Sequence, residues 1–346
     1  MKSYKYKKLA DTLLAQIKDG SYPPHTRLPP IRTLAAAHGV NTATAIGAYK
    51  YLERLGRVHT RAGSGTYVSV PGMPEPGPPQ RDYINFAGGD TDPMLFPAEA
   101  FGQAVAQVLA TQGKAAFAEP IMGGYAPLRE ALAEEKGIDP RRVFILSGMQ
   151  QGHEIFSEIK KNHAHVKIEE DFEGDFYYNS TPPWFLWEAE PHGVVYVKSY
   201  GKILMPGLAH MVVPEAIQEA CAEYITGSAP GLVQRAFNVF VRGGGFAAHT
   251  ARMRAVYGRR YRKTIEAAGA YLPGYAGFDT PGTGLTLNLY PKGKYGKDID
   301  TLCQRLLQRK VILSPISPLK ISFAAVPEER AAEGIGIIAA VLATMA

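Results

Sequence analysis

A lysine in the middle of the chain is the residue best placed for covalent chemistry. Lys202 comes just after residues 194–199, whose β-branched run predicts a buried strand, and an apolar turn over residues 203–208 follows it. Partial desolvation lowers the pKa of such an amine, which can then attack a carbonyl group to form a Schiff base. A surface cation is the more common explanation when this pattern stands alone.

A second stretch has the residue types of an anion site. Residues 143–146 predict a short strand that leads through Ser147, Gly148, Met149 and Gln150 into a helix. Free backbone amides at a helix N-terminus bind anions, most often phosphate. An ordinary turn between a strand and a helix is the more common explanation of this pattern taken alone.

Near the N-terminus, residues 31–56 predict two helices joined by a tight turn, which is a helix-turn-helix. Pro29 and Pro30 suit the first helical turn, Gly39 ends the first helix, and Asn41 can cap the second. The residues at helical spacing are Ile31, Leu34, Ala35 and His38 in the first helix, and Ile46, Tyr49 and Leu52, expected to be buried, in the second.

A β-hairpin is predicted after the second helix, with strands at 57–61 and 66–70 and a glycine-containing tip at 62–65. Such a wing gives the helix-turn-helix a second DNA contact. Hydroxyl groups can meet base edges or phosphates, cations can neutralise phosphates, and glycine amides can hold the backbone. The residues expected to contact DNA are Arg32, Thr42, Thr44, Lys50, Arg54, Arg61, Gly63, Ser64 and Gly65.

The distribution of charge favours this interpretation over an ordinary small domain with a solvated basic face. Residues 1–80 contain eleven Lys and Arg but four Asp and Glu, a net charge of +7. The whole chain carries +6, so residues 81–346 carry −1. The excess positive charge therefore lies on the segment with the helix-turn-helix, as phosphate binding requires.

Three motifs make residues 4–70 resemble a GntR-type winged helix-turn-helix, a bacterial transcription-factor module. They are L-P-x-x-R from Leu28 to Arg32, A-Y-x-x-L-E-x-x-G from Ala48 to Gly56, and G-S-G-T-Y-V from Gly63 to Val68. Thr42 stands where the family usually has an arginine. The resemblance implies that residues 1–70 form a DNA-binding domain for double-stranded operator DNA.

Length and composition indicate a protein with at least two domains. The chain has 346 residues, 46% of them hydrophobic, and it contains neither an apolar run long enough for a membrane span nor a signal-peptide pattern. We therefore expect a cytoplasmic protein without a membrane partner. Cys221 and Cys303 are isolated, so no metal site or disulfide framework is predicted. Five prolines in residues 71–79 predict a semi-rigid linker, at 71–82, before a second domain at 83–346.

Residues 83–346 resemble the fold-type I aminotransferase domain and, together with the N-terminal module, the MocR subgroup of GntR regulators. The matching motifs include D-P-x-L-F-P from Asp92, L-S-G-M-Q-Q from Leu146, E-E-D-F-E-G-D-F from Glu169 and S-Y-G-K-x-L-x-P-G-L from Ser199. The expected fold is a mostly α winged helix-turn-helix followed by an α/β aminotransferase-like domain. Part of the large-domain sheet is expected to be missing, because only sixteen residues separate Gln151 from Ile168.

This second resemblance implies pyridoxal 5′-phosphate bound covalently to Lys202. The resemblance assigns the phosphate to residues 147–150 and Ser199, the ring nitrogen to Glu170 or Asp171, and a ligand carboxylate to Lys320. The chain departs from the family at several anchors. The 3′-oxygen partner, usually Tyr, is Phe172, and the phosphate-binding Arg is Ala209, with His210 as the nearest basic substitute.

Three functions remain open from the sequence. The first is a regulator whose second domain senses a small-molecule effector through pyridoxal phosphate. The second is a regulator whose second domain lacks the cofactor and serves dimerisation or another ligand. The third is an active aminotransferase with a DNA-binding module, which is disfavoured because the electron-sink pairing and the carboxylate clamp are altered. We expect a homodimer, since one winged helix reads only a half-site.

Overall fold

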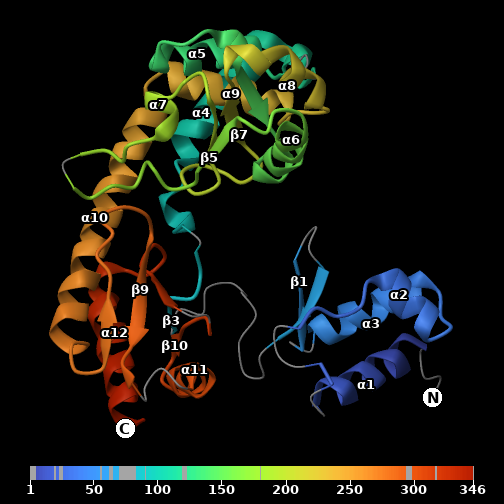
Figure 1. The fold of residues 1–346 in the computed structure, drawn as a ribbon, viewed down its shortest axis with the longest axis vertical. Coiled ribbons are helices and arrows are strands. Elements are labelled where there is room, and N and C mark those ends of the chain that lie inside the picture. The colour runs from blue at the N-terminus through green and yellow to red at the C-terminus, as the bar shows by residue number, and fades with distance from the viewer. Residues whose placement is uncertain are drawn as a thin grey trace. The chain divides into compact units, whose positions relative to one another are not determined.

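A computed structural model describes residues 5–18, 21–22, 26–54, 57–61, 65–69, 83–89, 91–118, 123–179, 181–293, 298–315 and 318–345. The chain divides into two compact units, residues 1–83 with 304–310 and residues 84–303 with 311–346. The predicted linker at 71–82 lies outside the described residues. Each unit is shown in Figure 1 with its own helices and strands.

The first unit contains the predicted helix-turn-helix and wing. Helices α1 (Lys5–Lys18), α2 (Ile31–Ala37) and α3 (Thr42–Arg54) are followed by strands β1 (Val58–Arg61) and β2 (Gly65–Val68), which pair antiparallel. Asn41 caps α3 as predicted, because its side-chain oxygen accepts the Thr44 N–H at 2.8 Å. The segment before α2 pairs with strand β2 of the wing. The Leu28 N–H donates to the Thr66 carbonyl, and the Val68 N–H donates to the Thr26 carbonyl.

A single apolar core holds these elements together. It contains Leu9 and Leu13 of α1, Leu34 and Ala35 of α2, and Ala45, Ala48, Tyr49 and Leu52 of α3. The prediction that Ile46 is buried is wrong, because this side chain is 39% exposed. The buried stripe of α3 runs through the neighbouring alanine, Ala45, which lies about 100° away around the helix. Ile31 is likewise exposed, and His38 follows the end of α2 instead of lying within it.

The second unit is built around a four-stranded mixed sheet with the order β4-β7-β6-β5. Its strands are β4 (Val143–Leu146), β5 (Lys167–Asp171), β6 (Val194–Ser199) and β7 (Ala209–Val212). Only β5 and β6 run parallel, and β5 lies at one edge. Helix α6 (Met149–Asn162) ends four residues before β5 begins, which confirms the predicted shortening of the sheet.

Helices cover this sheet. One face packs on α6 and α8 (Gln218–Tyr224) through Ile155, Phe156, Ile159 and Cys221. The other helices near the sheet are α4 (Ala98–Gln112), α5 (Ala126–Lys136), α7 (Leu186–Ala189) and α9 (Gly231–Arg242). Short 3-10 turns occur at Pro93–Leu95, Gly113–Phe117, Pro140–Arg142 and Glu215–Ile217.

A second, three-stranded antiparallel sheet of this unit has the order β11-β9-β8. Its strands are β8 (Ala276–Phe278), β9 (Thr286–Pro291) and β11 (Leu319–Ser322). The long helix α10 (Gly245–Tyr271) contacts α9 at one end and α12 (Glu328–Thr344) along the other (Figure 1). Strands β3 (Ile84–Asn85) and β10 (Val311–Ile312) form a parallel pair, and α11 spans Ile299–Gln308. No helix among the described residues is long and apolar enough to span a membrane.

Candidate nucleic-acid interface and lysine pocket

Helix α3 is fixed to the start of α2 by a side chain of its buried stripe. The Tyr49 hydroxyl donates a 2.6 Å hydrogen bond to the Pro29 carbonyl, and burial raises the pKa of this hydroxyl. Tyr49 is 4% exposed. The hydrogen bond satisfies a polar group that would otherwise be costly to bury, and it ties α3 to the segment just before α2.

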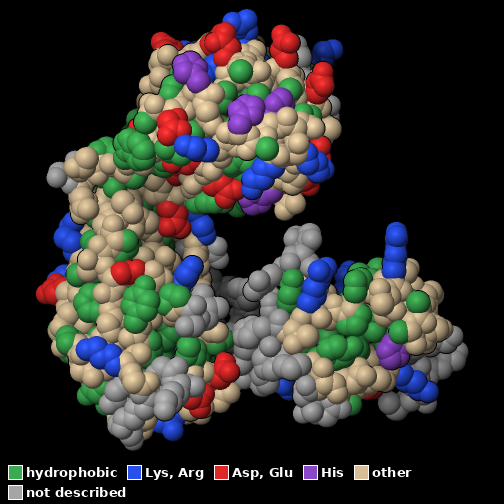
Figure 2. Space-filling model, in the orientation of Figure 1, with side chains coloured by type: hydrophobic (Ala, Val, Ile, Leu, Met, Phe, Trp, Pro, Cys, Tyr) green, Lys and Arg blue, Asp and Glu red, His purple; other side chains and the backbone are tan. Residues whose placement is uncertain are grey.

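The predicted DNA contacts of the helices lie on the surface of this unit. Arg32 on α2 is exposed, as are Thr42 and Lys50 on α3, whereas Thr44 is half-buried next to the Asn41 cap. Arg54 lies at the end of α3. Figure 2 shows Lys and Arg side chains on the visible face of this unit, where Asp and Glu side chains are scarce.

The predicted contacts of the wing are described in part. Arg61 ends β1 and Gly65 begins β2, while Gly63 and Ser64 lie outside the described residues. Gly65 has a φ of +124°, and a Cβ added there would come within 2.7 Å of the Arg27 side chain. Glycine is therefore required at this position both for the backbone conformation and for the close approach.

Lys202 lies in a turn directly after β6. The N–H groups of Leu204 and Met205 both donate to the Tyr200 carbonyl, which closes this turn. The Lys202 amine donates to the Gly89 carbonyl, so it lies beside the segment that enters the second unit. Two elements far apart in sequence thus meet at the predicted nucleophile.

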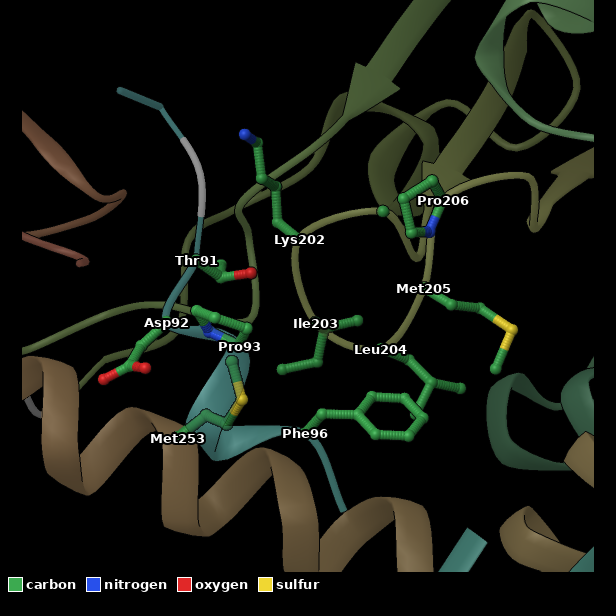
Figure 3. Close-up of a pocket in the computed structure, with 11 residues that line it drawn as sticks. Thr91, Asp92, Pro93, Phe96, Lys202, Ile203, Leu204, Met205, Pro206 and Met253 are labelled. Atoms are coloured by element: carbon green, nitrogen blue, oxygen red, sulfur yellow. The ribbon is translucent and has the colours of Figure 1, made fainter. Parts of the chain in front are cut away.

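A pocket of about 530 Å³ surrounds this turn. Figure 3 shows Lys202 extending toward one end, and Phe96 and Met253 lying at the other. The lining residues are Thr91, Asp92, Pro93, Phe96, Gly201, Lys202, Ile203, Leu204, Met205, Pro206 and Met253. One amine beside a mostly apolar wall can hold a small ligand with an acidic or carbonyl group and an apolar body.

A buried arginine that sequence reasoning missed positions one wall of this pocket. Arg260 on α10 is 8% exposed and pairs with Asp92 at 2.7 Å. It also donates to the Ala324 carbonyl, and the Tyr257 hydroxyl accepts the Asp92 N–H at 3.1 Å. These contacts fix the 3-10 turn that carries Phe96. The motif G-R-R at the middle of a helix gave no sign of this ion pair.

The Ser147 end of the predicted anion cradle is engaged within the chain. The Ser147 N–H and hydroxyl both donate to the Gln151 side-chain oxygen, at 2.8 and 3.0 Å. Gly148 has a φ of +110°, and a Cβ added there would lie 3.3 Å from the Gly207 Cα. Met149 packs against the core of the sheet and Gln150 is exposed.

The hydroxyl of Ser199, at the end of β6, is also engaged, since it accepts the Gly201 N–H at 3.1 Å. The side chain of Ser199 is 9% exposed. This hydrogen bond holds the start of the turn that carries Lys202. Ser199 therefore has a local structural role in addition to the predicted phosphate contact.

Glu170 and Asp171 lie in different environments on β5. The Glu170 carboxylate is 2.8 Å from the His153 ring on α6, a partner that the sequence did not reveal. Asp171 is 3% exposed and accepts hydrogen bonds from the Tyr196 hydroxyl at 2.6 Å and the Gly174 N–H at 2.7 Å. Because strand residues alternate, the two carboxylates face opposite sides of the sheet. Asp171 is thus committed to the side away from His153.

Asp171 belongs to a buried ionic cluster. Lys198 of β6 lies 2.7 Å from Asp175 and 3.4 Å from Asp171. Burial lowers the pKa of Lys198, but the two carboxylates more than offset this, so its pKa lies above the ordinary value. The cluster places one cation between two carboxylates and joins β5 to β6.

The structure corrects the expectation for His210. On β7 this residue is paired with Lys198, next to the position that is paired with Ser199, so its ring lies on the other face of the sheet from Ser199. His210 is 1% exposed, with its Nδ1 2.8 Å from the Tyr200 hydroxyl. Burial lowers its pKa well below the ordinary value. The imidazole is therefore neutral at pH 7 and cannot replace the phosphate-binding cation.

Lys320, the predicted carboxylate partner, is exposed on β11 opposite Asn288 of β9. It is not among the residues that line the pocket at Lys202. Phe172, after β5, is 42% exposed. The structure thus brings Lys202 to the pocket but does not gather Lys320 or Phe172 there.

Several residues that the resemblance assigns to pyridoxal phosphate are replaced or have partners within the chain. The Ser147 donors are taken by Gln151, Ala209 replaces the phosphate-binding arginine, and Phe172 has no donor for the 3′-oxygen. Glu170 already holds His153. Each missing partner is expected to weaken cofactor binding by about 1–3 kcal/mol.

Comparisons with known proteins find similarity to both parts of the chain. Residues 5–68 match the family of bacterial regulatory proteins, gntR family. The uncharacterized HTH-type transcriptional regulator YdcR of Escherichia coli is 30% identical over 173 residues, which span 42% of this chain but only 37% of that relative. The probable rhizopine catabolism regulatory protein MocR of Rhizobium meliloti is 20% identical, over 82% of this chain and 80% of that protein.

The fold of the second unit is also found in a solved enzyme. LysN, an alpha-aminoadipate aminotransferase from Thermus thermophilus that was crystallised with N-(5′-phosphopyridoxyl)-L-leucine, aligns with a TM-score of 0.65. The alignment covers 77% of this chain and 93% of LysN at 22% identity. This likeness shows the aminotransferase fold.

Proposed function

We propose that this chain, which joins a GntR-type helix-turn-helix to an aminotransferase fold, is a transcriptional regulator that binds operator DNA. The observation that carries the proposal is the first unit, in which a capped α3 presents Thr42 and Lys50 outward and a wing follows. Similarity to HTH-type regulators such as MocR supports the same function. The whole chain is proposed to act as a homodimer on paired half-sites.

The second unit is proposed to sense a small molecule without pyridoxal phosphate. Its support is the Lys202 pocket, which keeps an amine and an apolar wall, together with the hydrogen bonds from Ser147 to Gln151. The ligand class that suits this pocket is a small carboxylic acid or carbonyl compound with an apolar body. Aminotransferase turnover is not part of the proposal, because the groups that would hold and tune the cofactor are committed elsewhere.

DNA binding is tested with the full-length protein and its own upstream promoter DNA, by fluorescence anisotropy at several salt concentrations. If roughly six phosphates are contacted, affinity falls about a thousandfold between roughly 50 and 200 mM salt. Arg32→Ala should weaken binding to promoter and unrelated DNA alike and lower the salt slope by about 1. No affinity at low salt, or a monomer by light scattering both free and on DNA, would contradict the corresponding part of the proposal.

The cofactor part is tested by absorption spectroscopy after incubation with excess pyridoxal phosphate. Wild type and Lys202→Ala should give the same spectrum, because the amine lacks the surrounding anchors. A visible band that is present in wild type, absent from Lys202→Ala and removed by borohydride would overturn this part. DNA binding would remain untouched by that outcome, so the two parts of the proposal fail separately.

A further inference from the structure

An isoleucine is exposed in the middle of the helix that the proposed function places on DNA. Ile46 of α3 is 39% exposed, whereas its neighbour Ala45 and the residues Ala48 and Tyr49 are buried. Large aliphatic side chains on a helix of this size are normally placed in the core. The core of this unit is already filled by the alanines of α3 and the leucines of α1 and α2. Ile46 is thus left for a contact outside the unit.

Helix α1 packs against one flank of α3, and this packing determines which face of α3 is left exposed. On one flank α1 packs closely, since a Cβ added at Gly47 would lie 3.2 Å from the Tyr6 Cβ, and the Tyr6 and Tyr51 rings are 6.0 Å apart. Successive residues of a helix are rotated by about 100°, so Ile46 lies on the side away from this contact. The open face of α3 is therefore the one that carries Ile46.

Three exposed residues follow this open face at the spacing of a helical stripe. Ala43, Ile46 and Lys50 are separated by three and four residues, and each is exposed. Two apolar side chains are thus followed by one cation on the same strip. Arg32 of α2 is exposed as well, and the segment has an excess of positive charge.

DNA is the occupant whose chemistry matches this strip. A protein-binding groove would be apolar along its length, whereas the stripe ends in a cation on a basic segment that neutralises phosphates. In the major groove the apolar group among the base edges is the 5-methyl of thymine, and aliphatic side chains contact it. We propose that Ile46 packs against a thymine methyl group and is a specificity determinant of the operator. The proposal rests on the proposed DNA-binding function.

The test replaces thymine by deoxyuridine, which has the same hydrogen-bonding edge but lacks the methyl group. A duplex is first selected by the full-length protein from a random library. Each thymine of that duplex is then replaced in turn, and affinity is measured by anisotropy. Loss of one buried methyl contact weakens binding about fourfold, so wild type should lose about that factor at one or two thymines per half-site.

Variants identify the side chain that reads the methyl group. Ile46→Ala should bind the thymine duplex about as well as wild type binds the deoxyuridine duplex, and deoxyuridine should then have no further effect. Ile31→Ala is the matched control, because it removes another exposed isoleucine of the same unit and should keep the full deoxyuridine effect. Circular dichroism checks that both variants are folded.

The outcomes separate the inference from the function on which it rests. If wild type binds the selected duplex but tolerates every deoxyuridine, or if Ile46→Ala keeps the full deoxyuridine effect, the assignment of Ile46 is overturned. If Ile31→Ala abolishes the effect instead, the contact belongs to α2 and the assignment again fails. If no duplex is enriched from the library, the DNA-binding function itself is contradicted.

Discussion

The helix-turn-helix and the lysine pocket have kept their family patterns to different degrees. In the first unit the pattern residues still make the contacts that build the fold: Asn41 caps α3, and Tyr49 ties it to Pro29. In the second unit Lys202 keeps its place after β6, but Ser147 and Glu170 have found partners within the chain. A fold can thus be kept while polar side chains near its pocket pair within the chain.

The difference follows from how the two sites are built. A helix surface is complete once one helix and its cap are formed, so α3 carries its contacts on neighbouring residues. The pocket at Lys202 needs segments that are more than one hundred residues apart, from Thr91 to Met253. Loss of any one segment removes a partner, and the remaining polar groups pair with what is nearest.

The largest expected effect concerns the separate cores. Leu52→Ala removes a fully buried side chain of the first unit and should destabilise that unit by about 2–5 kcal/mol. Leu289→Ala is the matched change in the second unit, where the side chain is also fully buried. Calorimetry of the full chain should show that each variant lowers a different unfolding transition. If both variants lower one shared transition equally, the units do not unfold separately.

The next effect concerns acid stability, which we assign to the second unit. His210 is neutral when folded, and its folded pKa lies well below the value of 6.5 that applies when it is unfolded. The unfolded chain therefore binds more protons below pH 6.5, and stability falls as the pH drops from 6.5 toward the folded pKa. The loss is at most about 1.4 kcal/mol per pH unit.

His210→Gln should flatten this dependence, as measured by urea unfolding of the second unit at pH 7.5, 6.5 and 5.5. The matched control is His38→Gln, which changes an exposed histidine of the first unit and should leave the slope as in wild type. An unchanged slope in His210→Gln would show that another group causes the acid sensitivity.

A smaller effect is expected at the helix cap. Asn41→Ala removes the acceptor of the Thr44 N–H and should destabilise the first unit by about 1 kcal/mol. Asn41→Ser keeps an acceptor at the same position and should recover most of the loss. Urea midpoints of the first transition measure both variants. Equal stability of wild type, Asn41→Ala and Asn41→Ser would show that the Asn41 cap does not stabilise the first unit.

The smallest expected effect is at Lys202. If its role is confined to ligand sensing, Lys202→Ala should change DNA affinity without added ligand by no more than about twofold, since substitutions away from a core typically change stability by about 0.5 kcal/mol or less. Anisotropy with the promoter duplex measures this. A large loss of affinity would show that Lys202 affects DNA binding even without a ligand. The two regions would then not act separately.

Much of the fold could be predicted because its signals are local. The predicted strands at 143–146 and 194–199 became β4 and β6 with the same bounds. Gly137 ends α5 with a φ of +64°, a conformation that glycine adopts without strain. These features need no knowledge of distant residues.

The errors have a different origin. Ile46 was expected in the core because it recurs with Tyr49 and Leu52 at helical spacing, yet the buried stripe of α3 runs through the smaller Ala45 and Ala48. His210 was expected at the phosphate, with Ser199, because it follows Ala209, which stands where the family has the phosphate-binding arginine. Strand alternation alone places His210 opposite to Ala209, but its relation to Ser199 depends on the register between β6 and β7. Such pairings cannot be read from one chain.

The position of β5 at the sheet edge has a consequence for how the protein behaves at high concentration. An open edge can pair with a strand of another molecule and so begin aggregation. On β5, Lys167, Glu169 and Glu170 are charged, and the Glu169 carboxylate accepts the N–H groups of Leu186 and Trp187 at 2.8 and 3.0 Å. An incoming strand would have to strip water from these charges. The charged side chains of β5 therefore disfavour pairing of this edge with a strand of another molecule.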